Sequence, residues 1–126
     1  MNTTTSKANQ LEQRLITFAA EIIALSYKLP RTPQGVQICE QILRSGTATA
    51  ANYGEARGAE SRADFIHKLK IVSKELNETT IWLELIAKSS LISPENLVAI
   101  VAENRELCRI IAASIRTARA GASGQT

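Results

Sequence analysis

Aromatic residues are scarce in this sequence: they make up 4% of its 126 residues, beside three prolines and six glycines. A core with so few rings must be built from Leu, Ile, Val and Ala, which favours helices, because small β-proteins use more aromatic and β-branched residues. So few prolines and glycines exclude a collagen-like or loop-dominated chain. The length suits one domain with one core, and 44% hydrophobic with 21% charged residues is ordinary for a soluble globular protein.

From the sequence we expect neither a membrane span nor a secretion signal. No apolar run approaches the roughly 18 residues that a membrane span needs. Residues 1–10 are polar, which is not typical of a secretion signal. Cys39 and Cys108 lie far apart and outside any CxxC pattern, on apolar stripes where we expect buried, reduced thiols. The expected location is cytoplasmic.

Apolar residues recur every three or four positions along almost the whole chain, which indicates α-helices. The spacing predicts four of them, over about residues 8–29, 35–56, 61–89 and 94–120, with a flexible tail at 121–126. Pro30 ends the first helix, because a residue before proline disfavours helical geometry. Ser61 and Ser93 are the predicted N-caps of the third and fourth helices. Short loops imply antiparallel neighbours, so we expect an all-α fold, with residues 1–126 forming a single up-down-up-down four-helix bundle.

The predicted second and third helices carry unusual residues. Residues 45–51 of the second helix are all small, although Gly and Thr are poor helix formers, and small side chains let a neighbouring helix approach closely. Both helices also have a polar face, which is either solvated or part of a polar seam, inside the chain or between subunits. Such a seam would fix the register of the helices more than it adds stability. Its predicted members are Arg44, Asn52, Glu55, Glu75 and Glu78, with Lys68 as a further partner.

Charge is segregated along the chain. The net charge of +3 divides into +1 for residues 1–61, +3 for residues 62–74, −4 for residues 75–104 and +3 for residues 105–126. In an antiparallel bundle the start of the third helix and the end of the fourth lie at the same end, which predicts a basic pole there. Its predicted members are Arg57, Arg62, Lys68, Lys70, Lys74, Arg105, Arg109, Arg116 and Arg119.

Two explanations of the basic pole stay open. Cations at the end of the fourth helix complement the helix dipole and need no ligand. That explanation does not cover the lysines of the third helix, which lie in its positive N-terminal half. The alternative is a surface that binds RNA or another polyanion. Because no Phe or Tyr interleaves with the arginines, such binding would use phosphates and shape instead of base stacking.

Residue sets for catalysis or cofactor binding are missing. Asp64 and His67 have the i, i+3 spacing of a helical metal-ligand pair, but the sequence has one histidine, whereas a di-iron bundle needs two Glu-x-x-His pairs. No Ser-His-Asp set and no glycine-rich phosphate loop are present. We therefore expect no enzyme, no metal site and no cofactor, and interpret His67 as a surface residue.

Several short motifs occur in a defined order along the chain. They are Arg44-Ser45, Asn52 with Glu55, Phe65 with Leu69 and Ile71, and Glu75 with Glu78. In this order the sequence resembles the small bacterial four-helix bundle proteins named after the 23S ribosomal RNA intervening sequence, also labelled S23 ribosomal protein. The resemblance covers roughly residues 15–115, and the sequence departs from the family pattern at Ala56, where members have glycine.

The resemblance implies a homopentameric barrel of four-helix bundles without enzymatic activity. It also implies kinship with the accessory protein of diversity-generating retroelements, a basic pentamer that binds a reverse transcriptase and structured RNA. We therefore expect a non-catalytic oligomeric bundle that binds structured RNA, another nucleic acid or a nucleoprotein partner through the basic pole. The alternative is a protein-only interaction scaffold, in which the segregated charge serves subunit assembly.

Overall fold

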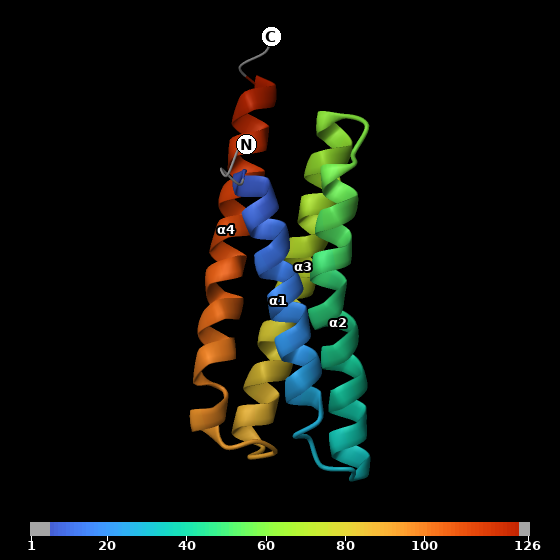
Figure 1. The fold of residues 1–126 in the computed structure, drawn as a ribbon, viewed down its shortest axis with the longest axis vertical. Helices are drawn as coiled ribbons and strands as arrows, with labels where there is room; N and C mark the ends of the chain where they lie inside the picture. The colour runs from blue at the N-terminus through green and yellow to red at the C-terminus, as the bar shows by residue number, and fades with distance from the viewer. Residues whose placement is uncertain (1–5, 124–126) are drawn as a thin grey trace, which may run out of the picture.

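The structure, a computed structural model, describes residues 6–123. Its elements, in chain order, are α1 (Lys7–Ser26), α2 (Pro33–Arg57), α3 (Arg62–Lys88), the short 3-10 helix η1 (Pro94–Asn96) and α4 (Val98–Ser123). Successive α-helices run in opposite directions (Figure 1). Within the described residues there is no β-strand. The predicted all-α, antiparallel four-helix bundle is confirmed.

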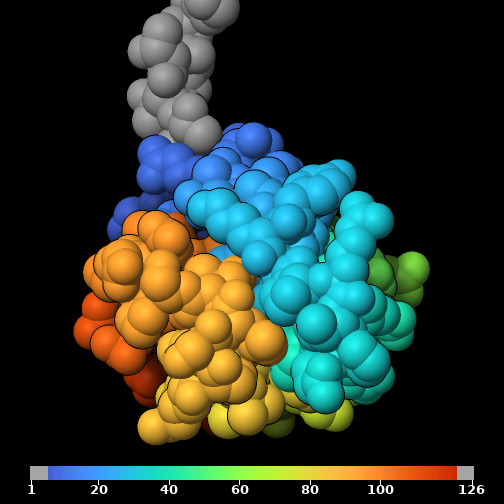
Figure 2. Space-filling model, turned by 90° about the horizontal axis from the view of Figure 1, so that it is seen from below, coloured from blue at the N-terminus to red at the C-terminus, as the bar shows by residue number. Residues whose placement is uncertain are grey.

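The four helices occupy the corners of a square when the bundle is viewed along its axis. In Figure 2 the end of α1 faces that of α3 across the bundle, and the start of α2 faces that of α4. The start of α1, the end of α2, the start of α3 and the end of α4 lie at the end drawn uppermost in Figure 1. We call this the upper end, and the opposite one the lower end.

The core lies between the helices and is almost entirely aliphatic. Leu15, Phe18 and Ile22 of α1 are completely buried, and Phe18 is the one aromatic ring among the fully buried large side chains. Burying a side chain of this size contributes roughly 1.5–3 kcal/mol. The remaining fully buried large side chains are Ile42, Leu69, Val72, Leu76, Leu83, Ile86, Leu97, Leu107 and Ile111.

The small residues of α2 allow close packing inside the chain. Ser45, Gly46 and Thr49 are buried. A Cβ atom at Gly46 would lie 2.8 Å from Cγ1 of Ile22 on α1, so α1 and α2 approach here to a distance that only glycine permits. Ser45 meets α3 on the neighbouring side, with its Oγ 2.9 Å from Oγ1 of Thr79. These residues therefore serve contacts between helices of one chain and do not by themselves indicate a subunit interface.

At the lower end of the bundle, two helix boundaries differ from the predicted ones. The first helix ends at Ser26 instead of residue 29, because the N–H groups of Lys28 and Leu29 bond to carbonyls three residues back and tighten the chain into a turn before Pro30. Ser93 is the N-cap residue of η1 and not of α4, and its Oγ accepts a hydrogen bond from Asn96 Nδ2 at 2.9 Å instead of from a backbone N–H. The segment after it forms η1, and α4 begins at residue 98.

At the upper end one prediction is correct and another is wrong. Oγ of Ser61 accepts a hydrogen bond from the N–H of Asp64 at 3.0 Å, so Ser61 is the N-cap of α3. The predicted tail begins too early, because α4 continues through Ser123. Alanine and arginine, which dominate residues 116–122, are strong helix formers and carry the helix on. Residues 124–126 of the predicted tail lie outside the described residues.

Candidate functional site

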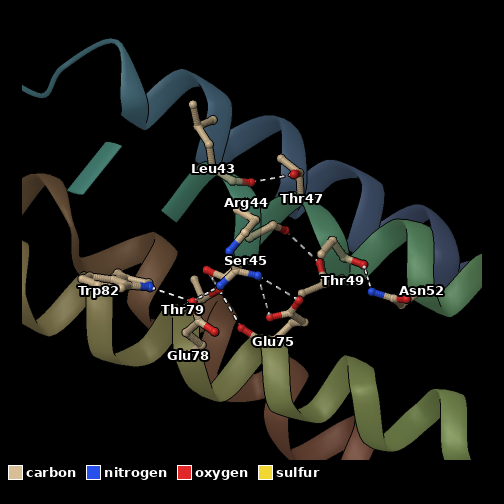
Figure 3. A network of polar contacts seen from close by, with 12 residues as sticks. Leu43, Arg44, Ser45, Thr47, Thr49, Asn52, Glu75, Glu78, Thr79 and Trp82 are labelled. Atoms are coloured by element: carbon tan, nitrogen blue, oxygen red, sulfur yellow. Dashed lines mark hydrogen bonds and ion pairs between the residues drawn. The ribbon is translucent and has the colours of Figure 1, made fainter. Parts of the chain in front are cut away.

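The predicted polar seam lies inside the chain, between α2 and α3 (Figure 3). The Arg44 guanidinium donates to the carboxylate of Glu75 at 3.3 Å and also to that of Glu78. Glu78 accepts a second hydrogen bond from Nε1 of Trp82 at 3.1 Å. The hydroxyls of Ser45 and Thr79 meet behind this exposed cluster. The structure thus brings together three of the predicted seam residues.

The seam continues toward the upper end with one ion pair but without Asn52. Nζ of Lys68 lies 2.9 Å from Oε1 of Glu55. Asn52 does not join a carboxylate, because its Nδ2 donates to the carbonyl of Ala48, one turn back in its own helix, at 2.9 Å. An Asn side chain within a helix has this local partner at hand, and heptad spacing does not reveal it.

Charge in the seam is compensated. The hydrogen bond from Trp82 and the one from Arg44 lower the pKa of Glu78. The hydrogen bond to Glu78 raises the pKa of Arg44, with attraction from Glu75 adding to the effect. Because one guanidinium faces two carboxylates, the seam offers no cation to an external anion. We interpret it as a structural contact between α2 and α3.

The contacts between α3 and α4 fix which of the predicted basic residues lie at the same level. Sγ of Cys108 lies 3.7 Å from Oδ1 of Asn77, and Nδ2 of Asn104 lies 2.6 Å from Oγ1 of Thr80. In antiparallel helices this register places Lys70, two turns above Asn77, level with the turn of α4 that holds Arg116.

The basic pole is smaller than predicted. Arg105 follows directly after Asn104, and it lines a cleft with Glu84 and Ala87 in the lower half of the bundle, so it lies away from the other cations. Lys74 and Arg109 lie near the middle of α3 and α4. The predicted members in the upper half are Arg57, Arg62, Lys68, Lys70, Arg116 and Arg119.

Several of the predicted cations already have partners. Arg57 donates to Oδ1 of Asn9 and to Oε1 of Glu12, each at 2.6 Å. Arg62 donates to the carbonyl of Ala118 at 3.3 Å. Two more are held by carboxylates: Lys68 pairs with Glu55, and Arg109 pairs with Glu106. Lys74, near the middle of α3, forms no ion pair among the described residues and only contributes to lowering the pKa of Glu78.

Three cations of the upper half differ from these. Lys70, Arg116 and Arg119 are exposed, and none has a carboxylate within ion-pair distance among the described residues. We call them the unpaired cations. Lys70 lies seven residues before Asn77, and Arg119 eleven residues after Cys108, so both are on the side where α3 and α4 meet. Arg116 lies one turn below Arg119, on the exposed flank of α4. A phosphate can bind such side chains without displacing an internal carboxylate, so these three residues form the candidate binding site.

Sequence reasoning missed one cation at this end. Lys7, the first residue of α1, lines a groove at the upper end together with Arg57 and Arg62. Its position at the start of the first helix was the available signal, because the first and third helices of such a bundle begin at the same end.

The two cysteines and the histidine lie outside the candidate binding site. Cys39 and Cys108 are free thiols, and both are half-buried, whereas buried thiols were predicted. Burial raises the pKa of Cys108. His67 is exposed. Within residues 6–123 no three His, Cys, Asp or Glu side chains form a group that could hold a metal ion. None of the helices in that range has an apolar stretch long enough to span a membrane.

Comparison with known proteins places this geometry in a family. The family model described as 23S rRNA-intervening sequence protein matches residues 7–113. A crystal structure of a protein with unknown function from the S23 ribosomal protein family of Bacteroides thetaiotaomicron is similar, with a TM-score of 0.82 and 38% sequence identity over 88% of this chain and 99% of that one. No curated protein matches the chain.

Proposed function

Because this chain belongs to the 23S rRNA-intervening sequence protein family, we propose that it is a non-catalytic helical bundle that binds structured RNA through its unpaired cations. The observation that carries the proposal is the absence of carboxylate partners for Lys70, Arg116 and Arg119 in the described chain. They lie at or beside the edge where α3 and α4 adjoin. Of the neighbouring cations of the basic pole, Arg57 and Lys68 pair with carboxylates, and Arg62 donates to a backbone carbonyl.

The chemistry of these residues suits phosphate groups. Arginine presents a planar fork of donors to phosphate oxygens, and lysine adds a point charge. Binding releases counterions condensed on the nucleic acid, so affinity falls steeply as salt rises. Since the edge carries no aromatic side chain between its cations, recognition rests on the shape and backbone of the RNA, as is typical for double-stranded regions.

A titration of a fluorescent RNA hairpin at two salt concentrations tests this proposal. The test variant is Arg116→Glu/Arg119→Glu, and the matched control is Lys28→Glu/Arg31→Glu, which makes the same change of charge on exposed residues at the lower end. We expect the test variant to lose about tenfold or more in affinity, while the control stays within about twofold of wild type. Equal losses in both variants would mean that net charge alone governs binding, and would overturn the site.

We also propose that the protein forms a homo-oligomer. Among the exposed large apolar side chains, Ile23 of α1 and Tyr27 directly after this helix form one group, with Tyr27 84% exposed, and Ile81 and Leu85 of α3 form another. Because α1 and α3 occupy opposite corners (Figure 2), one face of each copy can contact the other face of the next. Contacts of this heterologous kind generate rings. The number of subunits, five, comes from the family resemblance.

Light scattering tests the assembly. A ring built from two different faces must dissociate when either is changed, so Tyr27→Glu and Leu85→Glu should each yield a lower mass than wild type. Ala20→Glu, at an exposed alanine of α1, tests whether any added charge has the same effect. A wild-type protein with the mass of one chain at micromolar concentration would contradict the proposal.

The protein partner that follows from the resemblance is a reverse transcriptase. In that form of the proposal the bundle holds a structured RNA beside the polymerase. Salt-insensitive binding of a reverse transcriptase together with no RNA affinity would favour the alternative function, a protein-only scaffold.

A further inference from the structure

As far as residues 6–123 are concerned, the bundle is open at its upper end. Figure 1 shows α1 beginning well below the end of α4. The ion pair between Arg14 and Glu103, 2.7 Å long, fixes the level of these two helices. With equal rise per residue, Lys7 is then level with Ile110, so the last three turns of α4 extend past the start of α1.

An apolar groove lies at this opening. It has a volume of about 920 Å³ and receives residues from all four helices and from the turn before α3. Phe65, Ile110, Ala113 and Ala118 supply its apolar surface. Phe65 and Ile110 are half-buried and Ala113 is exposed, whereas Ala118 is 7% exposed.

The charged residues that line the groove are all cations. They are Lys7, Arg57 and Arg62, which come from three different helices, and no carboxylate of residues 6–123 lines it. Arg57 is held by Asn9 and by the carboxylate of Glu12, and Arg62 by the Ala118 carbonyl. Because Glu12 compensates Arg57, the positive charge available to a ligand comes from Lys7 and Arg62. An apolar surface bounded by fixed positive charge is complementary to a ligand that is apolar on one face and acidic at its edges. RNA does not match it, because phosphates and sugars gain nothing from an apolar floor.

We propose that this groove binds an amphipathic, acidic helix of a partner protein. The bound helix lies beside the last turns of α4, at the corner that α1 leaves open, and its carboxylates face Lys7 and Arg62. Three turns of α4 span about 16 Å, which calls for a segment of some 10–14 residues. Apolar residues spaced i, i+3, i+7 on that segment would contact Ile110, Ala113 and Phe65. The proposal does not depend on RNA binding at the α3–α4 edge.

Selection from a displayed library of helix-forming 14-residue peptides against the full-length protein tests the proposal. We expect enriched peptides to be acidic, with apolar residues at helical spacing. Ala113→Trp fills the groove at an exposed position and should weaken their binding at least tenfold. Ala99→Trp, at an exposed alanine near the lower end of the same helix, should change it less than twofold. Lys7→Glu/Arg62→Glu should reduce binding of acidic peptides and favour basic ones.

A second groove variant and three further outcomes can refute the proposal. Thr117→Trp, also exposed in the groove, replaces Ala113→Trp if circular dichroism shows that the first variant is unfolded. Selection of no peptides, selection of neutral or basic peptides, or binding that neither tryptophan variant weakens would overturn the proposal. Loss of RNA affinity in Ala113→Trp would assign the groove to RNA instead. A changed mass of that variant in light scattering would assign it to a second copy of the chain.

Discussion

The two sides of α3 carry charge in different ways. Toward α2, Arg44 and Lys68 meet the carboxylates of Glu75, Glu78 and Glu55 within the chain. At and beside the edge that α3 shares with α4, the unpaired cations meet no carboxylate of the described residues. The first arrangement neutralises itself and joins two helices. The second leaves positive charge for an external anion. Whether a cation stabilises the fold or can bind a ligand therefore depends on its contacts in the structure, not on its neighbours in the sequence.

The largest expected effect concerns the close packing of α2 against α1 at Gly46. Gly46→Ala would place a Cβ atom 2.8 Å from Cγ1 of Ile22, and we expect it to destabilise the fold by about 1–3 kcal/mol. Gly54→Ala, in the same helix, is the matched control: its Cβ would make an ordinary contact at 3.6 Å with Oε2 of Glu12. The control should stabilise by roughly 0.5–1 kcal/mol, because alanine is the better helix former. Urea unfolding measures both, and equal effects would contradict the packing described here.

An effect of up to the same size is expected for the buried hydroxyl pair of Ser45 and Thr79. Thr79→Val leaves the Ser45 hydroxyl without its partner at 2.9 Å and should cost about 1–3 kcal/mol. Ser45→Ala in the Thr79→Val background should recover part of this loss, since both polar partners are then gone. Strictly additive effects in the double-mutant cycle would show that the two hydroxyls do not interact.

Whether the sequence predicts one of these contacts depends on how far apart its two residues lie along the chain and on how regular the geometry between them is. Heptad spacing brought Arg44 onto the face of Glu75 and Glu78 because these contacts join neighbouring helices of regular geometry. The pair Glu106–Arg109 is also readable from its i, i+3 spacing, although charge counting alone placed Arg109 among the binding residues. Arg57 and Glu12 are 45 residues apart, and only the tertiary arrangement joins them.

The extent of the basic pole and the groove depend on helix levels. Arg105 belongs to the arginine stripe of α4 in the sequence, yet the register of α3 against α4 places it in the lower half, beside Glu84. Likewise, the helical pattern gives the start of the first helix near residue 8 but not its level beside α4. Packing of the core and contacts such as Arg14–Glu103 set that level, so the groove was not predictable from periodicity.

The pH dependence of the seam gives the smallest expected effect on stability. Hydrogen bonds from Trp82 and Arg44 lower the pKa of Glu78 from its ordinary value of 4.5. The charged form therefore stabilises the fold above that value, and the contribution is lost as pH falls through the lowered pKa. At pH 7 the free energy of unfolding of wild type should exceed that of Glu78→Gln by at most about 1 kcal/mol, because the Arg44–Glu78 pair is partly exposed. Thermal unfolding from pH 7 to 3 should show the two curves converging, and a gap that widens on acidification would contradict the assignment.

The most direct test of the account compares paired with unpaired cations at equal loss of charge. Lys70→Gln/Arg116→Gln removes two unpaired cations, and Lys68→Gln/Arg109→Gln removes two that hold Glu55 and Glu106. Binding of the RNA hairpin is measured across a range of salt concentrations. We expect the first variant to lose affinity and its log–log salt slope to shrink by about two, while the second keeps a slope near that of wild type. Equal slopes in the two variants would contradict the claim that unpaired charge forms the binding site.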